Sequence, residues 1–260
     1  MNNSELKPFI REGLAILFVG LNPASISNIK GHYFSVRMDF WNQLYDSGLI
    51  TKKLDKDKAD ITVFGTTKIN INNWSYGITD LVPEIAESDS NKIKPKKEHC
   101  DNLINSIIKY NPKVVILLHG KVLKYFLRHL DVNKPVINSG NLGNILKGCD
   151  SLFFNIAFPH GNTIPKGEKV EMYKEVYRYL MSCDKPQPLL SEGDTFSSRC
   201  VYPIKRPDGR ILLPPPGKCW RFTRERFEAL LKDGMILFDE NGMPNQIIRC
   251  GCNIKTCENI

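Results

Sequence analysis

The sequence predicts an α/β protein: a three-layer sandwich around a central four-stranded parallel sheet, followed by a small C-terminal α+β module. Two continuous apolar runs, residues 15–19 and 114–118, have the length and composition of strands that are buried on both faces, and residues 152–157 form a further strand. Segments with helical periodicity lie between these runs, and alternating strands and helices are typical of a parallel sheet. The composition changes near residue 184, which indicates that a separate unit follows.

The first apolar strand ends in the segment Gly20-Leu21-Asn22-Pro23-Ala24. A glycine lets the backbone approach a ligand closely, and a proline cannot continue the hydrogen-bonding pattern of a strand. Asn22 therefore lies at the carboxyl end of a central strand, which is where open α/β sheets bind their ligands. A strand followed by an ordinary turn is the alternative interpretation.

The segments after this strand alternate in character. Apolar residues at positions 40, 41, 44 and 45 predict a helix with one buried face, and Gly48 ends it. Residues 50–74 are rich in Lys and Asn, which favours an irregular, exposed segment, and residues 76–82 form a short strand. The remaining elements follow in order: an amphipathic helix at 96–110 with Leu103, Ile104, Ile107 and Ile108 inside, a strand at 114–118, a helix at 121–130, a strand at 152–157 and a helix at 168–181.

The chain is expected to form two domains. The first covers residues 1–184, a linker covers 185–194, and the module covers 195–260. Two prolines within four residues at 185–188 favour the linker. In the module we expect a helix at 223–232 and a strand at 235–238 that runs into an Asn-Gly turn.

Charge narrows the classes of partner. A net charge of +8 and a pI near 9.0 favour a polyanion such as nucleic acid, with an ordinary basic surface as the alternative. No run of 18 apolar residues is present, so no membrane span is expected. The first eight residues lack the apolar region of a signal peptide, and we expect a cytoplasmic monomer. No cofactor is expected. A Rossmann-like protein that binds small nucleotides is a competing interpretation, but it should show a Gly-rich phosphate loop, and none follows the first strand.

Four cysteines raise the question of a zinc site. Cys250, Cys252 and Cys257 cluster near the C-terminus, and Cys219 could complete a set of four sulfur ligands. The spacing of the cluster does not match the usual paired zinc knuckles. We therefore predict no metal site and leave these four residues as an open alternative.

Four segments together resemble a known family. They are Gly20-Leu21-Asn22-Pro23-Ala24, the stretch from His32-Tyr33-Phe34 to Phe40-Trp41, Gly77-Ile78-Thr79-Asp80-Leu81-Val82, and Phe158-Pro159-His160-Gly161-Asn162-Thr163. In this order and spacing they resemble the uracil-DNA glycosylase superfamily, and within it the mismatch-specific uracil/thymine DNA glycosylase branch. The resemblance covers about residues 10–182.

The resemblance implies a monofunctional DNA glycosylase, a hydrolase that flips a base out of double-stranded DNA and leaves an abasic site. It assigns a catalytic role to Asn22. His160 stands where relatives place a Ser that contacts phosphate, and we expect it to hold the backbone or the departing base as a second catalytic residue, with an inert loop histidine as the alternative. The side-chain carbonyl of Asn22 would orient the attacking water, but an amide takes up no proton near neutral pH and is not a strong base. Such a site favours bases that already leave well.

The resemblance also assigns base-binding roles to Gly20, Leu21, Tyr33, His119 and Phe158. Tyr33 takes the place of the aromatic residue that stacks on the flipped base, with a core aromatic as the alternative. His119 stands where uracil-specific relatives carry an Asn that reads the base edge, and a buried helix-capping histidine is the alternative. Phe158 replaces an Asn or His that helps to stabilise the leaving base.

The second motif is expected to hold DNA. Gly161, Asn162 and Thr163 follow His160, and Asn162 replaces the Leu that relatives insert into the duplex. Asp39 and Asp80, near the ends of the first and second strands, could each assist the water, although a solvated loop carboxylate is the simpler interpretation.

The C-terminal module resembles a segment of restriction-modification adenine-specific DNA methyltransferases, although no methyl-donor motif accompanies it. The similar residues are 214–223 and 227–234. We expect Arg221 and Arg224 to contact DNA, on a basic and aromatic surface that also holds Trp220, Arg199, Arg206 and Arg210. A small packing module is the alternative.

The sequence leaves the substrate open. The missing uracil-reading Asn and the restriction-type tail suggest a 5-substituted cytosine in foreign or phage DNA, and thus a role in antiviral defence. A mismatch or uracil glycosylase in DNA repair is one alternative. A non-catalytic protein that binds modified bases is an alternative of another class, and abasic-site formation distinguishes it.

Overall fold

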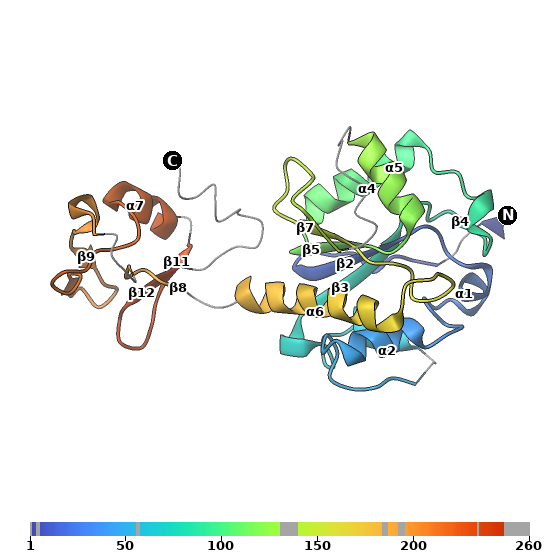
Figure 1. The fold of residues 1–260 in the computed structure, drawn as a ribbon, viewed down its shortest axis with the longest axis horizontal. Helices are drawn as coiled ribbons and strands as arrows, with labels where there is room; N and C mark the ends of the chain where they lie inside the picture. The colour runs from blue at the N-terminus through green and yellow to red at the C-terminus, as the bar shows by residue number, and fades with distance from the viewer. Residues whose placement is uncertain are drawn as a thin grey trace. The chain divides into compact units, whose positions relative to one another are not determined.

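The computed structural model describes residues 2–3, 6–55, 58–130, 140–183, 187–191, 196–232 and 234–246. The chain divides into two compact units, with the boundary between Leu180 and Met181. The first unit holds a sheet with helices on both faces, and the second is a smaller mixture of short strands and one helix (Figure 1). No helix in these ranges is long and apolar enough to cross a membrane.

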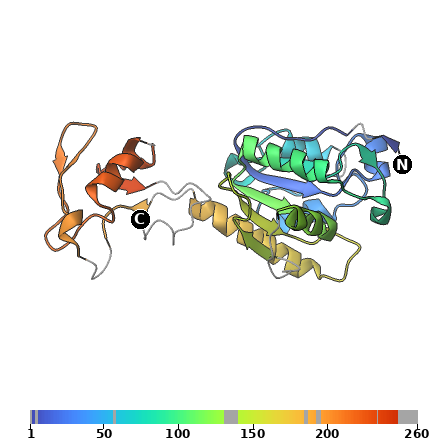
Figure 2. The ribbon, with the colours of Figure 1, turned by 90° about the horizontal axis from the view of Figure 1, so that it is seen from above.

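The central sheet has five strands in the order β3-β2-β5-β7-β6. Their bounds are Ser75–Asp80 for β3, Leu14–Gly20 for β2, Val114–Leu117 for β5, Leu152–Asn155 for β7 and Gly140–Gly143 for β6. The first four run parallel, and they lie side by side with β2 buried along its whole length (Figures 1 and 2).

The prediction of a four-stranded sheet was one strand short, because β6 pairs antiparallel with β7. The β6 sequence, Gly-Asn-Leu-Gly, has no apolar run and a single buried residue, Leu142. Its strand conformation depends on the edge of the neighbouring strand, which local sequence patterns do not reveal.

Helices cover both faces of the sheet, with α4 and α5 on one side and α2 and α6 on the other (Figure 1). Their bounds are Ser25–Lys30 for α1, Asp39–Asp46 for α2, Ala59–Phe64 for α3, Lys97–Tyr110 for α4, Gly120–His129 for α5 and Lys166–Cys183 for α6. On the α4 and α5 side, aliphatic residues such as Leu17 and Val115 meet Ile107 and Phe126 in one cluster.

Aromatic rings fill the opposite face of the sheet. Phe18 of β2 contacts Phe40 of α2 at 5.3 Å and Tyr173 of α6 at 6.4 Å between ring centroids. The ring of Phe64 lies 5.8 Å from that of Phe18 and 5.5 Å from that of Trp41. These contacts close the third layer.

Three details of the predicted helices were wrong. Residues 50–74 are not irregular and exposed throughout, because α3 and a short 3-10 helix, Ile71–Asn73, lie within them and Val63 and Phe64 are fully buried. Tyr45 and Ile108, expected on inner helix faces, are 36% and 41% exposed. Lys, Asp, Asn and Thr are scattered among the apolar residues of 50–74, so the pattern of those that enter the core is hard to recognise.

Two short elements border the candidate site. Strand β4, Ile85–Ala86, pairs with β1, Asn2–Asn3, and a 3-10 helix covers Ser90–Lys92. The segment between them approaches the end of β2, since the backbone N–H of Glu87 donates to the carbonyl of Pro23 at 3.0 Å.

The second unit has its own core. Strands β11, β12 and β8 form an antiparallel sheet, β9 and β10 form a hairpin, and α7 is its helix. The bounds are Gln187–Pro188 for β8, Ile204–Lys205 for β9, Ile211–Leu212 for β10, Arg224–Lys232 for α7, Ile236–Phe238 for β11 and Pro244–Gln246 for β12, with a 3-10 helix at Ser198–Cys200. Pairing thus begins at Gln187, inside the segment that the sequence assigns to a linker.

Two residues expected on a DNA-binding surface are wholly or mostly buried in the module instead. Trp220 is fully buried, and its indole Nε1 donates to the carbonyl of Tyr202 at 2.8 Å. The Arg206 guanidinium, 19% exposed, occupies the space that a Cβ at Gly242 would fill. Both therefore stabilise the fold of the module.

Candidate active site

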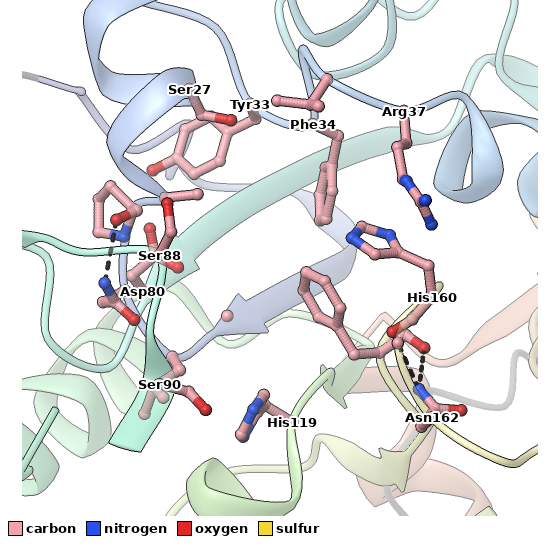
Figure 3. Close-up of a pocket in the computed structure, with 18 of the residues that line it drawn as sticks. Ser27, Tyr33, Phe34, Arg37, Asp80, Ser88, Ser90, His119, His160 and Asn162 are labelled. Carbon is pink, nitrogen blue, oxygen red and sulfur yellow. Dashed lines mark hydrogen bonds between the residues drawn. The ribbon is translucent and has the colours of Figure 1, made fainter. Parts of the chain in front are cut away.

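A pocket of about 800 Å³ lies in the first unit, at the edge where β2, β3, β5 and β7 end (Figure 3). Parallel strands bring their carboxyl ends to one edge, so segments far apart in the sequence meet here. The pocket brings together ten residues that the sequence singles out: Gly20, Leu21, Asn22, Tyr33, His119, Phe158, His160, Gly161, Asn162 and Thr163.

The side chain of Asn22 is held in a single orientation. Its Nδ2 lies 2.9 Å from the carbonyl oxygen of Pro23, 3.2 Å from that of Ile85 and 2.7 Å from that of Glu87. Carbonyl oxygens only accept hydrogen bonds, so the amide must present its NH2 group to all three. No group within the described ranges donates to the opposite atom, Oδ1, which leaves that oxygen to accept a hydrogen bond from water.

Position 20 must be a glycine because of Asp80 on the adjacent strand. Gly20 of β2 and Asp80 of β3 are directly paired in the parallel register. A Cβ atom at position 20 would lie 2.2 Å from Oδ1 of Asp80, which is far closer than van der Waals contact. The glycine therefore makes room for the carboxyl group of Asp80.

Asp80 is not the solvated loop carboxylate that the sequence favoured. It is 7% exposed and lines the pocket, and its Oδ2 has no hydrogen-bond partner among the described residues. Burial raises the pKa of Asp80 to about 7, an effect that a hydrogen bond from the Tyr33 hydroxyl partly opposes. Figure 3 shows Tyr33 and Asp80 on the same side of the pocket.

Phe34 is a site residue that sequence reasoning missed. Tyr33, the expected stacking residue, is 6% exposed, and burial raises the pKa of its hydroxyl. Phe34 is half-buried, lines the pocket and adopts a left-handed backbone with φ of 51°. That conformation is rare for a bulky residue and costs about 1–3 kcal/mol, so it marks a residue held for a purpose.

Aromatic rings line the side of the pocket around Phe34. Its ring stacks on Phe40 at 4.0 Å and lies 6.1 Å from Phe158, whose ring lies 5.0 Å from His160. Phe34, Arg37 and His160 lie together, across from Tyr33 and Asp80 (Figure 3). Together these side chains offer a flat apolar surface on which a planar base can stack.

His119 caps a helix, as one interpretation of the sequence proposed. Its Nδ1 accepts a hydrogen bond from the backbone N–H of Lys121 at 3.0 Å, at the first turn of α5. Burial, and then the charge of Lys121, lower the pKa of His119. The ring is therefore neutral at pH 7 and carries its proton on Nε2, which can donate to a ligand in the pocket.

The comparisons with known proteins agree with this geometry. The sequence matches the family described as Uracil DNA glycosylase superfamily over residues 8–202, three quarters of the chain. The chain belongs to the uracil-DNA glycosylase superfamily. Members of this superfamily are in general DNA glycosylases, hydrolases that act on DNA. A search of curated proteins finds no match to the chain.

The superfamily match covers the whole first unit from residue 8 and ends at residue 202, so most of the second unit lies outside it. The mismatch-specific branch and the methyltransferase-like segment stay predictions. Arg221 and Arg224 belong to the second unit, are exposed and take no part in the pocket.

The second motif, residues 158–163, forms a loop that side chains of α2 and α6 hold by hydrogen bonds. The carbonyl of Pro159 accepts from Gln43 Nε2 at 3.0 Å and from the buried Nζ of Lys169 at 3.2 Å. Asn162 closes the loop on itself, since its Nδ2 donates to the carbonyls of Phe158 and His160. The amide of Asn162 therefore shapes the loop and does not project from it.

His160 is a further titratable residue of the pocket. Burial lowers the pKa of His160, the charges of Arg37 and Lys169 add to this, and Asp39 opposes it. The ring is thus neutral at pH 7, and its buried Nδ1 has no hydrogen-bond partner within the described ranges. Asp39 itself does not line the pocket, whereas Asp80 and Glu87 do.

Three of the four candidate zinc ligands lie outside the described residues. Cys250, Cys252 and Cys257 lie there, and Cys219 is buried in the second unit. Among the residues described, no group of three or more His, Cys, Asp or Glu side chains could hold a metal ion.

Proposed function

We propose that the protein is a monofunctional DNA glycosylase that flips a nucleotide out of double-stranded DNA and hydrolyses its N-glycosidic bond. The observation that carries this proposal is the fixed amide of Asn22. Three backbone carbonyls orient it, and its unoccupied Oδ1 stands at the end of β2 in a pocket large enough for a base. Superfamily membership supports the reaction class.

In this proposal Asn22 holds the attacking water and the aromatic side of the pocket holds the base. The flipped base stacks on Phe34, and stacking of this kind contributes roughly 1–3 kcal/mol per base. Oδ1 of Asn22 accepts a hydrogen bond from the water and directs its oxygen towards C1′. An amide is no nucleophile, so water attacks C1′ directly and an abasic site remains.

The substrate we propose is a 5-substituted cytosine in foreign or phage DNA. A pocket of about 800 Å³ is in the range that accepts drug-sized ligands, and it is larger than one unmodified pyrimidine ring requires. Phe158 and Ala24 add apolar surface to its lining. Phe158 offers no hydrogen bond to the base, so a plain uracil gains little there.

Uracil or mismatch repair is the second candidate reaction, because the superfamily match itself favours it. A base-binding protein without activity is the candidate of another class. The pKa values of His119 and His160 are both lowered, so both rings are expected to be neutral at pH 7. Neutral rings can hydrogen-bond to a base whether or not the base is then released, so these contacts do not distinguish a binding protein from an enzyme. Formation of abasic sites is the property that separates the two.

We further propose that the second unit contacts the DNA duplex. Arg221 and Arg224 are exposed, although Arg224 Nε lies 3.1 Å from Oε1 of Glu228 on the next turn of α7. An exposed pair of this kind contributes about 0–1 kcal/mol, so a phosphate can replace the carboxylate at little cost. The net charge of +8 supports a polyanionic partner.

The proposal is tested by mass spectrometry of the bases that the protein releases. The substrates are duplexes with uracil, thymine mismatches, cytosine and 5-substituted cytosines, and phage DNA with hypermodified cytosine. Release of a 5-substituted cytosine with abasic sites in equal number supports the proposal. Release of uracil alone would indicate a repair glycosylase. Binding to DNA without release of any base would contradict the enzymatic assignment.

A further inference from the structure

The pocket contains a carboxyl group for which the water-positioning mechanism has no use. Asp80 ends β3 beside Gly20, lines the pocket and is 7% exposed. Its Oδ1 occupies the space that a Cβ at position 20 would need, and its Oδ2 is without a hydrogen-bond partner in the described part of the chain. A buried carboxyl oxygen left unsatisfied is costly, so a fold that keeps one has a use for it.

Burial favours the protonated form of Asp80. The Tyr33 hydroxyl, which donates to Asp80 from the segment before α2, opposes this effect, and burial, together with the charge of Asp60 in α3, raises the pKa of Tyr33. Glu87 and His119 also line the pocket: Glu87 is acidic, and the lowered pKa of His119 keeps its ring neutral at pH 7. Burial raises the pKa of Asp80 to about 7, far above that of an ordinary Asp, so this carboxyl can hold a proton near neutral pH.

We propose that Asp80 is a catalytic acid that contacts the flipped base and gives it a proton as the glycosidic bond breaks. This inference rests on the proposed function, since it assigns a role within the same pocket. The group it recognises is a ring nitrogen with a free lone pair beside an exocyclic amine, as in a cytosine-type base. The carboxyl O–H donates to that ring nitrogen, and the carbonyl oxygen accepts from the amine.

The proton moves from the Asp80 carboxyl to N3 of the base, the C1′–N1 bond breaks, and its electron pair stays with the base. The base therefore leaves as a neutral molecule. The water held by Asn22 forms the new C1′–O bond and releases a proton to solvent, and Asp80 regains a proton from solvent. No oxidant, reductant or cofactor takes part.

This role explains how an amide site can act on cytosine. Asn22 activates water weakly, so the reaction depends on how well the base leaves. An unprotonated cytosine would leave as an anion and is a poor leaving group. Protonation at N3 removes that charge, and a carboxyl with a pKa near the working pH is an efficient donor.

The test is the pH dependence of single-turnover base release from a duplex with one 5-hydroxymethylcytosine. We expect the wild-type rate to be constant below about pH 7 and to fall about tenfold per pH unit above it. Asp80→Asn keeps the shape of the side chain but has no acidic proton. It should lower the rate by about 10²-fold or more and abolish this pH dependence. Asp46→Asn, which removes an exposed carboxylate of α2, serves as the matched control and should follow the wild type.

Two outcomes are decisive. An Asp80→Asn variant with the wild-type rate and pH profile overturns the inference while the proposed function stands. If the wild type releases no base, its affinity is measured for a duplex with the uncleavable 2′-fluoroarabino analogue of the same nucleotide. Tighter binding below pH 7 in the wild type but not in Asp80→Asn would support the contact between Asp80 and the base and contradict the glycosylase activity. Equal pH dependence of binding in the two proteins would contradict the contact between Asp80 and the base as well.

Discussion

At the scale of single residues, the site depends on side chains that each satisfy two requirements. The Nδ2 of Asn22 fastens the end of β2 to the 85–87 segment, while its Oδ1 remains available for water. His119 caps α5 with Nδ1 and keeps its Nε2–H for the pocket. In both cases the structural hydrogen bond fixes which atom faces the ligand, so the fold determines the chemistry of the site.

Asn22→Ala should therefore affect both activity and stability. Loss of the water contact should lower base release by about 10²-fold or more. Loss of three hydrogen bonds to backbone carbonyls should also destabilise the fold by about 1–3 kcal/mol. The measurements are single-turnover rates and thermal unfolding, with duplex affinity as the control. Release at the wild-type rate would refute the assignment of Asn22.

Asp80 should make the protein less stable as the pH rises. Its pKa is about 7 in the folded protein and near 3.8 when unfolded, so the folded state binds the proton more tightly. The free energy of unfolding should fall between about pH 4 and pH 7, by an amount on the order of 3–4 kcal/mol. Asp80→Asn should lack this decline and exceed the wild type in stability at pH 8. Urea unfolding across this pH range measures it, and parallel curves for the two proteins would contradict the prediction.

At the scale of elements, two neighbouring strand ends act as a unit. Gly20 and Asp80 are paired in the register of β2 and β3, and the backbone N–H of Leu81 donates to the carbonyl of Gly20 at 2.9 Å. The carboxyl group therefore lies over the glycine and reaches the pocket only while position 20 has no Cβ.

A double-mutant cycle tests this coupling. Gly20→Ala should displace the Asp80 carboxyl, destabilise the protein by about 1–3 kcal/mol and lower base release at least tenfold. In an Asp80→Ala background the same change should cost much less, because the group it collides with is gone. Gly167→Ala in α6 is a control, since nothing lies within 4 Å of a Cβ built there and Gly167 does not line the pocket. Additive effects of Gly20→Ala and Asp80→Ala on the unfolding free energy would show that the two positions do not interact.

Elements with strong local patterns could be predicted from the sequence, and elements that depend on a neighbour could not. The apolar runs at 15–19 and 114–118 became β2 and β5, because burial on both faces leaves a continuous pattern. The Gly-Asn-Leu-Gly strand β6 carries no such pattern, and α3 is hidden by the polar composition around it.

The same distinction holds for the site. Asn22 was predicted because it follows the end of a recognisable strand. The choice of Phe34 over Tyr33 depends on one backbone angle and on which ring is buried. The burial of Asp80 depends on its pairing with Gly20 across two strands. Neither relation is visible along the chain.

At the scale of the whole molecule, two units with separate cores divide the proposed tasks. The first holds the pocket, and the second is organised around Trp220 and Phe227 and carries exposed arginines. The superfamily match ends at residue 202, so the second unit is mostly an addition to the glycosylase fold. Each unit can thus be tested by itself.

Removal of residues 186–260 should weaken duplex binding and reduce its salt dependence, without changing which base is released. Each lost phosphate contact should make the slope of log affinity against log salt shallower by about 0.9. Fluorescence anisotropy over a salt series measures this slope. The double variant Arg221→Ala/Arg224→Ala keeps the module and should also weaken duplex binding and make the salt dependence shallower. Equal affinity and equal slope for all three proteins would show that the module does not contact DNA.

The central claim is that this pocket excises a 5-substituted cytosine through water held by Asn22. The most direct measurement compares alkali-sensitive strand cleavage, under single-turnover conditions, on two duplexes that differ only in one base: 5-hydroxymethylcytosine or uracil. We predict clear cleavage of the first duplex by the wild type, weak or no cleavage of the second, and no cleavage of either duplex by Asn22→Ala. Faster cleavage of the uracil duplex, or equal cleavage by Asn22→Ala, would contradict this claim.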